Sequence, residues 1–114
     1  MSNIEDKMDR MVQQWACRQK SYLSYMPAQC GHHYKKRRID LLRWDLRNII
    51  PLTFNEHTLV HSGALHVEIQ NPFRLLYLEQ RATINLKSYL LENGWTRDEW
   101  LKIQYTKLER ELDE

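Results

Sequence analysis

The stretch of residues 63–94, GALHVEIQNPFRLLYLEQRATINLKSYLLENG, constrains the fold of this chain more than any other. Apolar and polar residues alternate between positions 65 and 70, which is the period of a half-buried strand. Asn71 and Pro72 then offer a favoured N-cap and a proline at the first helical position. The sequence therefore predicts a strand followed, almost without a linker, by a long helix over about residues 72–92.

The residues before this strand predict its partner. Residues 58–61, TLVH, are rich in strand-forming types, and Ser62-Gly63 is typical of a turn. We therefore expect a β-hairpin over about residues 57–70, with one apolar and one polar face. Because two strands alone are marginally stable in water, the apolar face is expected to lie against helices.

Two helices are expected before the hairpin. In residues of about 3–23 and 35–50, apolar side chains recur at intervals near three and four, as on one face of a helix. Ser2 and Glu5 have the spacing of a capping box at the start of the first helix. Pro51 ends the second, because the residue before a proline resists the α conformation.

A last helix is expected over about residues 97–112. Asn93-Gly94 is a stop signal, and Thr96 with Glu99 has the spacing of a second capping box. A strand over residues 101–105 is the less favoured alternative. The expected order is α-α-β-β-α-α in a single small α+β domain over residues 1–114, with the β-hairpin packed on the helices.

Composition and charge narrow the function. Apolar residues make up 42% and charged residues 28% of 114, which is ordinary for one globular domain and too apolar for a disordered chain. The net charge of +2 is too small to identify a nucleic-acid partner by itself. The charge is unevenly spread, however, since residues 18–43 hold seven Lys or Arg and one acid. This asymmetry favours an anionic partner, with a merely solubilising surface as the alternative.

The clearest charged feature is residues 31–44, GHHYKKRRIDLLRW. Four consecutive basic residues at a helix start oppose the helix dipole, which indicates either a loop or a function. Basic side chains beside aromatic ones suit phosphate contact and base stacking. The candidate nucleic-acid-binding residues are Tyr34, Lys35, Lys36, Arg37, Arg38, Arg43 and Arg47. A solvated run, or contact with the acidic tail of another copy, is the alternative.

Metal and catalytic motifs are not recognisable in the sequence. Cys17, Cys30, His32 and His33 supply ligand types that zinc selects, but they lack the two close pairs of a zinc finger. His57, His61 and His66 are explained as the polar face of the expected hairpin, with a pH-sensitive contact as an alternative. The three glycines are far apart, so no phosphate loop is present. We predict no metal, no cofactor and no catalytic residue.

The expected setting is the cytoplasm. Two cysteines are fewer than a small secreted scaffold usually carries, and no apolar signal segment opens the sequence. The apolar runs are only a few residues long, which is too short to span a membrane.

A Trp-bearing segment is followed by a glycine, alternating apolar residues, a small polar break and an apolar helix: Trp44, Gly63, Leu65, Val67, Ile69, Asn71 and the helix to Leu91. In this order of features, residues 57–90 resemble the DciA-like family of bacterial helicase-loading proteins, which have a small KH-like α-α-β-β-α domain. The strand-to-helix unit is also similar to the N-terminal interaction domain of the bacterial initiator DnaA. The resemblance implies a replication-associated protein that touches DNA and the replicative helicase.

The sequence favours a non-enzymatic binding or adaptor protein that contacts nucleic acid, or another acidic surface, and helps to assemble a nucleoprotein complex. It predicts a protein partner as well. The alternative is a pure protein-interaction subunit or a homodimer that uses the apolar helix 72–92. The candidate partner-binding residues are Phe73, Tyr77, Trp95 and Trp100, because aromatic anchors dominate interfaces. An enzyme or metal-dependent domain is the least favoured reading, because no motif supplies the roles that a site requires.

Overall fold

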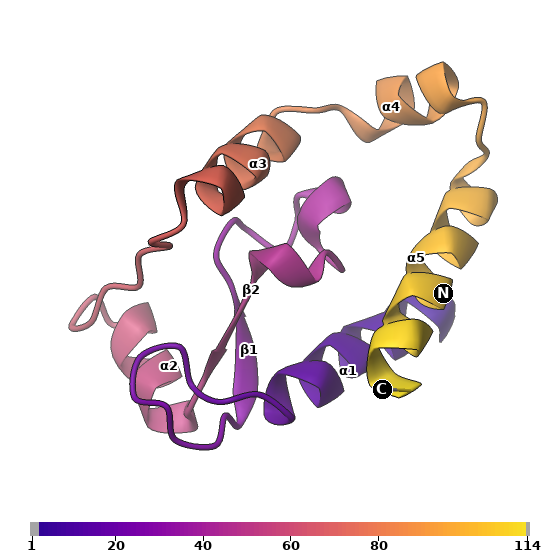
Figure 1. The fold of residues 1–114 in the computed structure, drawn as a ribbon. Coiled ribbons are helices and arrows are strands. Elements are labelled where there is room, and N and C mark those ends of the chain that lie inside the picture. Colours follow the sequence, from indigo (N-terminus) through magenta and orange to yellow (C-terminus); the bar gives the residue numbers. More distant parts are fainter. Residues whose placement is uncertain (1–2, 114) are drawn as a thin grey trace.

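The fold is built around one antiparallel pair of strands, β1 (Cys30–His33) and β2 (Ile49–Leu52). In the computed structural model, which describes residues 3–113, this pair packs on helix α1 (Asn3–Cys17) (Figure 1). Gly31 permits the close packing, because a Cβ atom there would lie 2.6 Å from Ile49 Cγ2 and 3.0 Å from Ala16 Cβ. A larger residue would push the strand and the helix apart.

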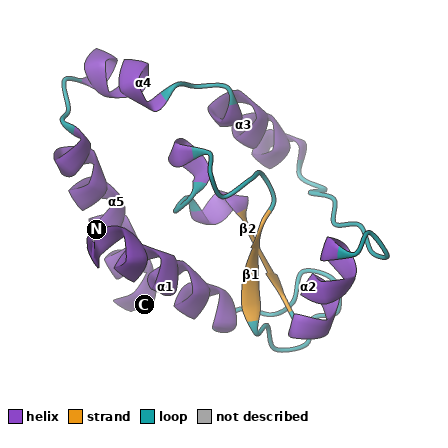
Figure 2. Cartoon of the chain, turned by 180° about the vertical axis from the view of Figure 1, so that it is seen from behind, coloured by secondary structure: helices purple, strands orange, loops and turns teal. Residues whose placement is uncertain are grey.

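The remaining elements surround the strand pair. Two short 3-10 turns, η1 (Asp40–Leu42) and η2 (Leu46–Asn48), lie in the connection between the strands. Four helices follow β2: α2 (Phe54–His61), α3 (Pro72–Ala82), α4 (Leu86–Asn93) and α5 (Arg97–Asp113). Figures 1 and 2 show α3, α4 and α5 forming an arch that returns the chain to α1, against which α5 packs.

The apolar interior forms two clusters. One joins α1 and α5 around Trp44 and Trp100, whose ring centroids lie 5.8 Å apart. The other joins β2 to α3 and includes Leu42, Ile69 and Leu78. The connection between the strands therefore contributes to both clusters. Among the described helices, none is long and apolar enough to cross a membrane.

The α+β class is confirmed, but the expected order of elements is wrong. Residues 35–50 form no long helix; they contain the two 3-10 turns and the start of β2. The apolar residues there do recur at helical intervals, but their side chains belong to two different clusters. Leu41 and Trp44 pack in one, and Leu42 packs in the other. One helical face cannot serve both clusters, so the backbone is irregular.

The expected hairpin over residues 57–70 is also wrong. Residues 54–61 are helical, because Thr53 caps the helix and Glu56 completes a capping box with it. This local cap outweighs the strand preference of Thr58, Leu59 and Val60, which depends strongly on context. Residues 64–65 form a bend, and residues 66–71 have neither regular secondary structure nor a strand partner, although Ile69 is buried in the cluster that joins β2 to α3.

Two expected helices are shorter than the sequence indicated. The first ends at Cys17 instead of about residue 23, and the chain then turns back so that Lys20 bridges Pro27. The helix expected over 72–92 is interrupted at residues 83–85, where Asn85 accepts from Ser88 N and starts α4.

The local caps of the second half are confirmed. The Asn71 side chain accepts from Phe73 N and Arg74 N at the start of α3. Gly94 ends α4 in the left-handed conformation, with φ of 69°. Thr96 and Glu99 form the expected capping box of α5, which is helical throughout 97–113. Ser2, half of the expected first box, lies outside the described residues.

Asn48 fixes the irregular connection from residue 34 to residue 48. Its fully buried side chain donates to Lys35 O (3.0 Å) and Leu42 O (3.2 Å) and accepts from Lys35 N (2.7 Å). Its backbone oxygen accepts from Tyr34 N (2.9 Å). One amide thus satisfies backbone groups at the start and in the middle of the connection.

Asn48→Ala is expected to lower the free energy of unfolding by about 3 kcal/mol, because buried donors and acceptors lose their partners. Urea denaturation followed by tryptophan fluorescence measures the change. Asn55→Ala is the matched control, since Asn55 is exposed on α2, and it should change stability by less than about 0.5 kcal/mol. Equal effects of the two substitutions would show that Asn48 does not carry the connection.

Candidate metal centre and the basic segment beside it

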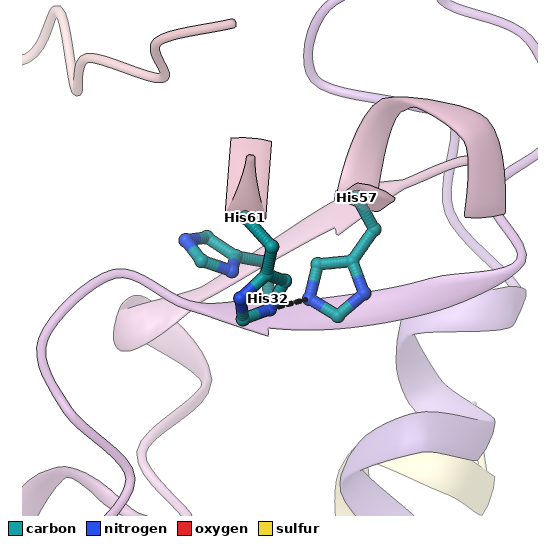
Figure 3. Close-up of side chains that lie close together, drawn as sticks. All are labelled: His32, His57 and His61. Atoms are coloured by element: carbon teal, nitrogen blue, oxygen red, sulfur yellow. Dashed lines mark hydrogen bonds between the residues drawn. The ribbon is translucent and has the colours of Figure 1, made fainter. Parts of the chain in front are cut away.

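Three histidines from two elements converge at one point. His32 lies on β1, and His57 and His61 lie one turn apart on α2 (Figure 3). One ring nitrogen of each lies within 4.8 Å of those of the other two. His57 Nε2 and His61 Nε2 are 2.9 Å apart, at hydrogen-bonding distance. This is the arrangement of a candidate metal centre.

The local structure explains why these rings meet. Residues four apart on a helix share a face, so α2 presents His57 and His61 together. The helix starts directly after β2, and Glu56 anchors it by accepting from the Ser21 hydroxyl (2.6 Å). Because β1 pairs with β2, with His32 opposite Ile50, the strand pair sets the distance from His32 to the helix.

The ligand set suits a transition-metal ion. Imidazole nitrogens favour zinc, copper, iron and nickel over magnesium or calcium. Zinc–nitrogen bonds of about 2.0–2.1 Å place two tetrahedral ligands about 3.4 Å apart, so these rings need shift by little more than 1 Å. Three protein ligands also leave a coordination position open, which is typical of catalytic and not of structural zinc sites.

The protonation state suits metal binding too. Burial, together with the nearby His57 and His61, lowers the pKa of His32 to about 4. Burial and then the neighbouring His61 lower the pKa of His57 as well. Both rings are therefore neutral at pH 7, and neutral imidazole is the form that binds a metal.

His32, His57 and His61 line a cavity of about 720 Å³. A fourth histidine, His33, lines it as well. Its Nε2 lies 2.9 Å from the backbone oxygen of Arg43, so Nε2 carries the proton and donates it in this bond. Burial lowers the pKa of His33, although the bond to the Arg43 carbonyl partly offsets this. The ring is thus held as a neutral imidazole whose Nδ1 is able to accept a proton.

Asp9 on α1 organises the basic side of the cavity. It accepts from Arg37, from Arg43 (2.6 Å and 3.0 Å) and from Trp44 Nε1 (2.9 Å). Burial alone raises the pKa of Asp9, but the hydrogen bonds from Arg43 and Arg37 outweigh it and lower the pKa. The charged carboxylate fixes Arg37 at the cavity, where Lys36 also lies.

The structure divides the expected nucleic-acid-binding residues. Three of them line the cavity beside the histidines: Tyr34, Lys36 and Arg37. Lys35 is half-buried, with its Nζ 5.9 Å from the centre of the Tyr34 ring, and Arg38 is exposed. Arg43 is paired inside the protein with Asp9 and Glu5, whereas Arg47 stacks on Tyr77 at a different cavity.

The expected partner-binding residues do not share one environment. Phe73 is 81% exposed, but Trp100 is 2% exposed and belongs to the core. Tyr77 is half-buried, donates to Asp45 and is covered by Arg47. Trp95 is half-buried and packs edge-on against Tyr89. Of the four, Phe73 is the one with a widely exposed side chain.

Sequence reasoning missed the histidine cluster for an identifiable reason. His57 and His61 were assigned to a strand, where a spacing of four carries no special meaning for a metal. The capping box of Thr53 and Glu56 is the signal that makes this spacing helical. His66 does not join the cluster, and the cysteines stay apart from it: Cys17 donates to Gln29 O and Cys30 to Leu52 O.

No protein-family model, curated protein or solved structure matches this chain. The resemblance of residues 57–90 to the DciA-like family therefore stays a prediction. The strand-turn-strand that carries the resemblance is, in the structure, a helix followed by a segment without regular secondary structure.

Zinc, cobalt or nickel ions are expected to bind the protein with one ion per chain. At one hundred times the dissociation constant, binding should raise the free energy of unfolding by about 2.7 kcal/mol. His57→Ala and His61→Ala should each abolish this stabilisation, whereas the matched control His66→Ala should retain it. Thermal melts with and without metal measure the effect. Equal loss in the His66 variant, or no stabilisation of the parent protein, would contradict the site.

In the presence of a chelator, the free energy of unfolding is expected to fall as the pH falls from about 6.5 to about 4. The folded pKa of His32 is about 4 and the ordinary value is 6.5, so the unfolded chain binds more protons in this window. His32→Gln should flatten the dependence, by on the order of 2 kcal/mol at pH 4. His66→Gln serves as the control. A parent and His32→Gln protein with the same pH profile would exclude this origin.

Proposed function

We propose that this protein is a metal-dependent phosphodiesterase that cleaves nucleic acid. The observation that carries the proposal is the position of His33, a neutral imidazole with a fixed tautomer, in the same cavity as the three-histidine cluster. A base beside a metal site with an open position is the arrangement that metal-assisted hydrolysis requires.

The charge around the cavity supports a phosphodiester as the substrate. Lys36 and Arg37 line it, and the exposed Arg38 follows directly in the chain. Arginine and lysine side chains at such a rim bind phosphate oxygens through charge-assisted hydrogen bonds. Residues 34–38 thus remain the proposed nucleic-acid contact. They would hold the phosphate backbone of the nucleic acid beside the histidines.

The chain's own groups have defined roles in hydrolysis. His33 Nδ1 takes a proton from a water molecule, and the resulting oxygen attacks phosphorus. The phosphorus–oxygen bond on the opposite side breaks, and the leaving oxygen is protonated from solvent to give an alcohol and a phosphate monoester. His32, His57 and His61 would hold the metal ion, which would supply Lewis-acid polarisation of the phosphoryl group when bound.

This proposal departs from the non-enzymatic role favoured by the sequence. That reading depended on the absence of an active-site motif, and the cluster is assembled only by the tertiary fold. Recruitment to a nucleoprotein complex is compatible with both the enzymatic and the non-enzymatic role, because both place the basic residues 34–38 against nucleic acid.

A second function, as a protein-interaction module, is favoured by one observation. Phe73 and Leu91 are 81% and 83% exposed, on α3 and α4 respectively, and Leu76 is 53% exposed. A contiguous exposed apolar patch marks an interaction site, and these side chains would form part of one on α3 and α4. This supports the apolar helices as the partner-binding part of the protein, whichever chemistry the histidines perform.

Cleavage of a labelled oligonucleotide tests the main proposal, with zinc, cobalt, nickel or magnesium added to chelator-treated protein. We expect cleavage with an imidazole-binding metal. His33→Ala should reduce the rate by about 10²–10⁴-fold while metal-induced stabilisation persists, because His33 acts as a base and not as a ligand.

Two further variants complete the test. His57→Ala should lose cleavage and metal-induced stabilisation together, and His66→Ala should keep both. Failure to cleave with any of the metals, or a His33→Ala protein with the parent rate, would overturn the proposal.

A further inference from the structure

A second cavity lies away from the histidine cluster, between the η1–η2 segment, α3 and α5. Its volume is about 610 Å³, within the range of about 300–1,000 Å³ that small-molecule sites occupy. No lining residue is shared with the cavity that holds the histidines. The two cavities are therefore separate sites.

Positive charge converges on this cavity from three elements. Five cationic side chains line it: Arg47 from η2, Arg74 and Arg81 from α3, and Lys107 and Arg110 from α5. Two carboxylates oppose them, Asp45 and Glu111. Asp45 is already engaged, since it accepts from the Tyr77 hydroxyl and from Arg47 N.

Arg47 has an ion-pair partner, since its Nε lies 3.8 Å from Asp45 Oδ1. Arg74 and Arg81, in contrast, are held by groups that leave their charge uncompensated. The Arg47 guanidinium lies 4.0 Å from the centre of the Tyr77 ring, and that of Arg81 lies 5.5 Å from the same ring. Arg74 donates to two backbone oxygens, those of Arg47 (2.7 Å) and Ile49 (3.2 Å). Within residues 3–113, no ion pair involves Arg74, Arg81, Lys107 or Arg110.

Arg81 also carries an unsatisfied donor. Its Nε is buried and has no hydrogen-bond partner among the described residues. A buried N–H without an acceptor is unfavourable, and an anion that reached it from the cavity would supply the acceptor. Guanidinium groups bind phosphate through two parallel hydrogen bonds, which favours phosphate over a simple halide.

The walls of the cavity are aromatic as well as basic. Trp15, Trp44 and Trp100 line it, and Trp15 is half-buried and so partly accessible. The cavity is much larger than a phosphate ion, and a planar ring beside indole surfaces fills the remaining space favourably. A phosphate joined to an aromatic ring is the chemistry of a nucleotide.

From these observations we propose that the cavity lined by Arg47, Arg81 and Lys107 binds a nucleotide unit, with its phosphate on the basic side chains and its base toward Trp15. The unit comes either from a free nucleotide or from a strand of nucleic acid. The site is separate from the proposed hydrolytic centre and does not depend on that proposal.

Binding is tested by intrinsic tryptophan fluorescence, in a chelator and with His57→Ala protein, so that metal-dependent cleavage does not interfere. The probes are ATP, adenosine, inorganic phosphate and a short single-stranded oligonucleotide. We expect ATP or the oligonucleotide to quench the fluorescence saturably, and adenosine to bind at least tenfold more weakly. Saturation by ATP identifies a free nucleotide as sufficient, whereas saturation by the oligonucleotide alone identifies a strand as the source.

The double substitution Lys107→Gln with Arg110→Gln should weaken binding at least tenfold, because both residues are exposed on α5 and removing them leaves the core intact. Lys87→Gln with Lys102→Gln is the matched control, since these exposed lysines lie outside the cavity. Arg81→Gln tests the unsatisfied donor directly, with its thermal melt recorded to confirm folding.

The proposal is overturned if neither ATP nor the oligonucleotide binds saturably, or if the control pair of substitutions weakens binding equally. Neither result bears on the metal centre, whose test is cleavage in the presence of metal. Conversely, a protein that binds nucleotide but does not cleave the oligonucleotide with any of the metals would overturn the hydrolytic proposal alone.

Discussion

The side-chain amide of Asn48 is the interaction on which the rest of the structure depends. The connection between β1 and β2 is long and irregular, and it has no ladder of its own to satisfy its backbone groups. Asn48, fully buried directly before β2, binds Lys35 just after β1 and Leu42 in the middle of the connection, and so ties the end of β1 to the start of β2. The pairing of β1 with β2 positions His32 and His33, and with them the basic residues 34–38 that follow. A small polar contact thus determines the geometry of a cavity that it does not line.

The two cavities divide the charge of the protein in a way that the sequence does not show. Arg43 and Arg47 both belong to the basic first half of the sequence. Arg43 forms an ion pair with Asp9, whereas Arg47 lines the cavity beside α3 and α5. Lys36 and Arg37 stay beside the histidines. The count of basic residues therefore overstates the charge available at any single surface, and two smaller sites describe it better than one continuous patch.

Features specified by a few adjacent residues were predictable from the sequence. The start of α3 at Asn71, the end of α4 at Gly94 and the capping box of α5 follow from local backbone hydrogen bonds. The pairing of β1 with β2 was not predictable, because it joins segments nearly twenty residues apart and β1 has the unusual sequence CGHH. The histidine cluster depends on that pairing and on the helicity of α2, so it could not be predicted without both.

The helix α2 has no buried residue, yet it carries two of the three clustered histidines. Its attachment includes its capping box, the Ser21–Glu56 bond, a bond from Phe54 N to the Gln29 side chain, and the contacts of its rings with His32. Its apolar contribution is the half-buried Val60, which packs against the cluster that joins β2 to α3. Segments with so little buried surface open locally at low free-energy cost, and their amide hydrogens exchange with solvent before those of the core. An ion bridging α2 to β1 would close that opening, so the metal supply of the cell would set how much of this helix is ordered at any moment.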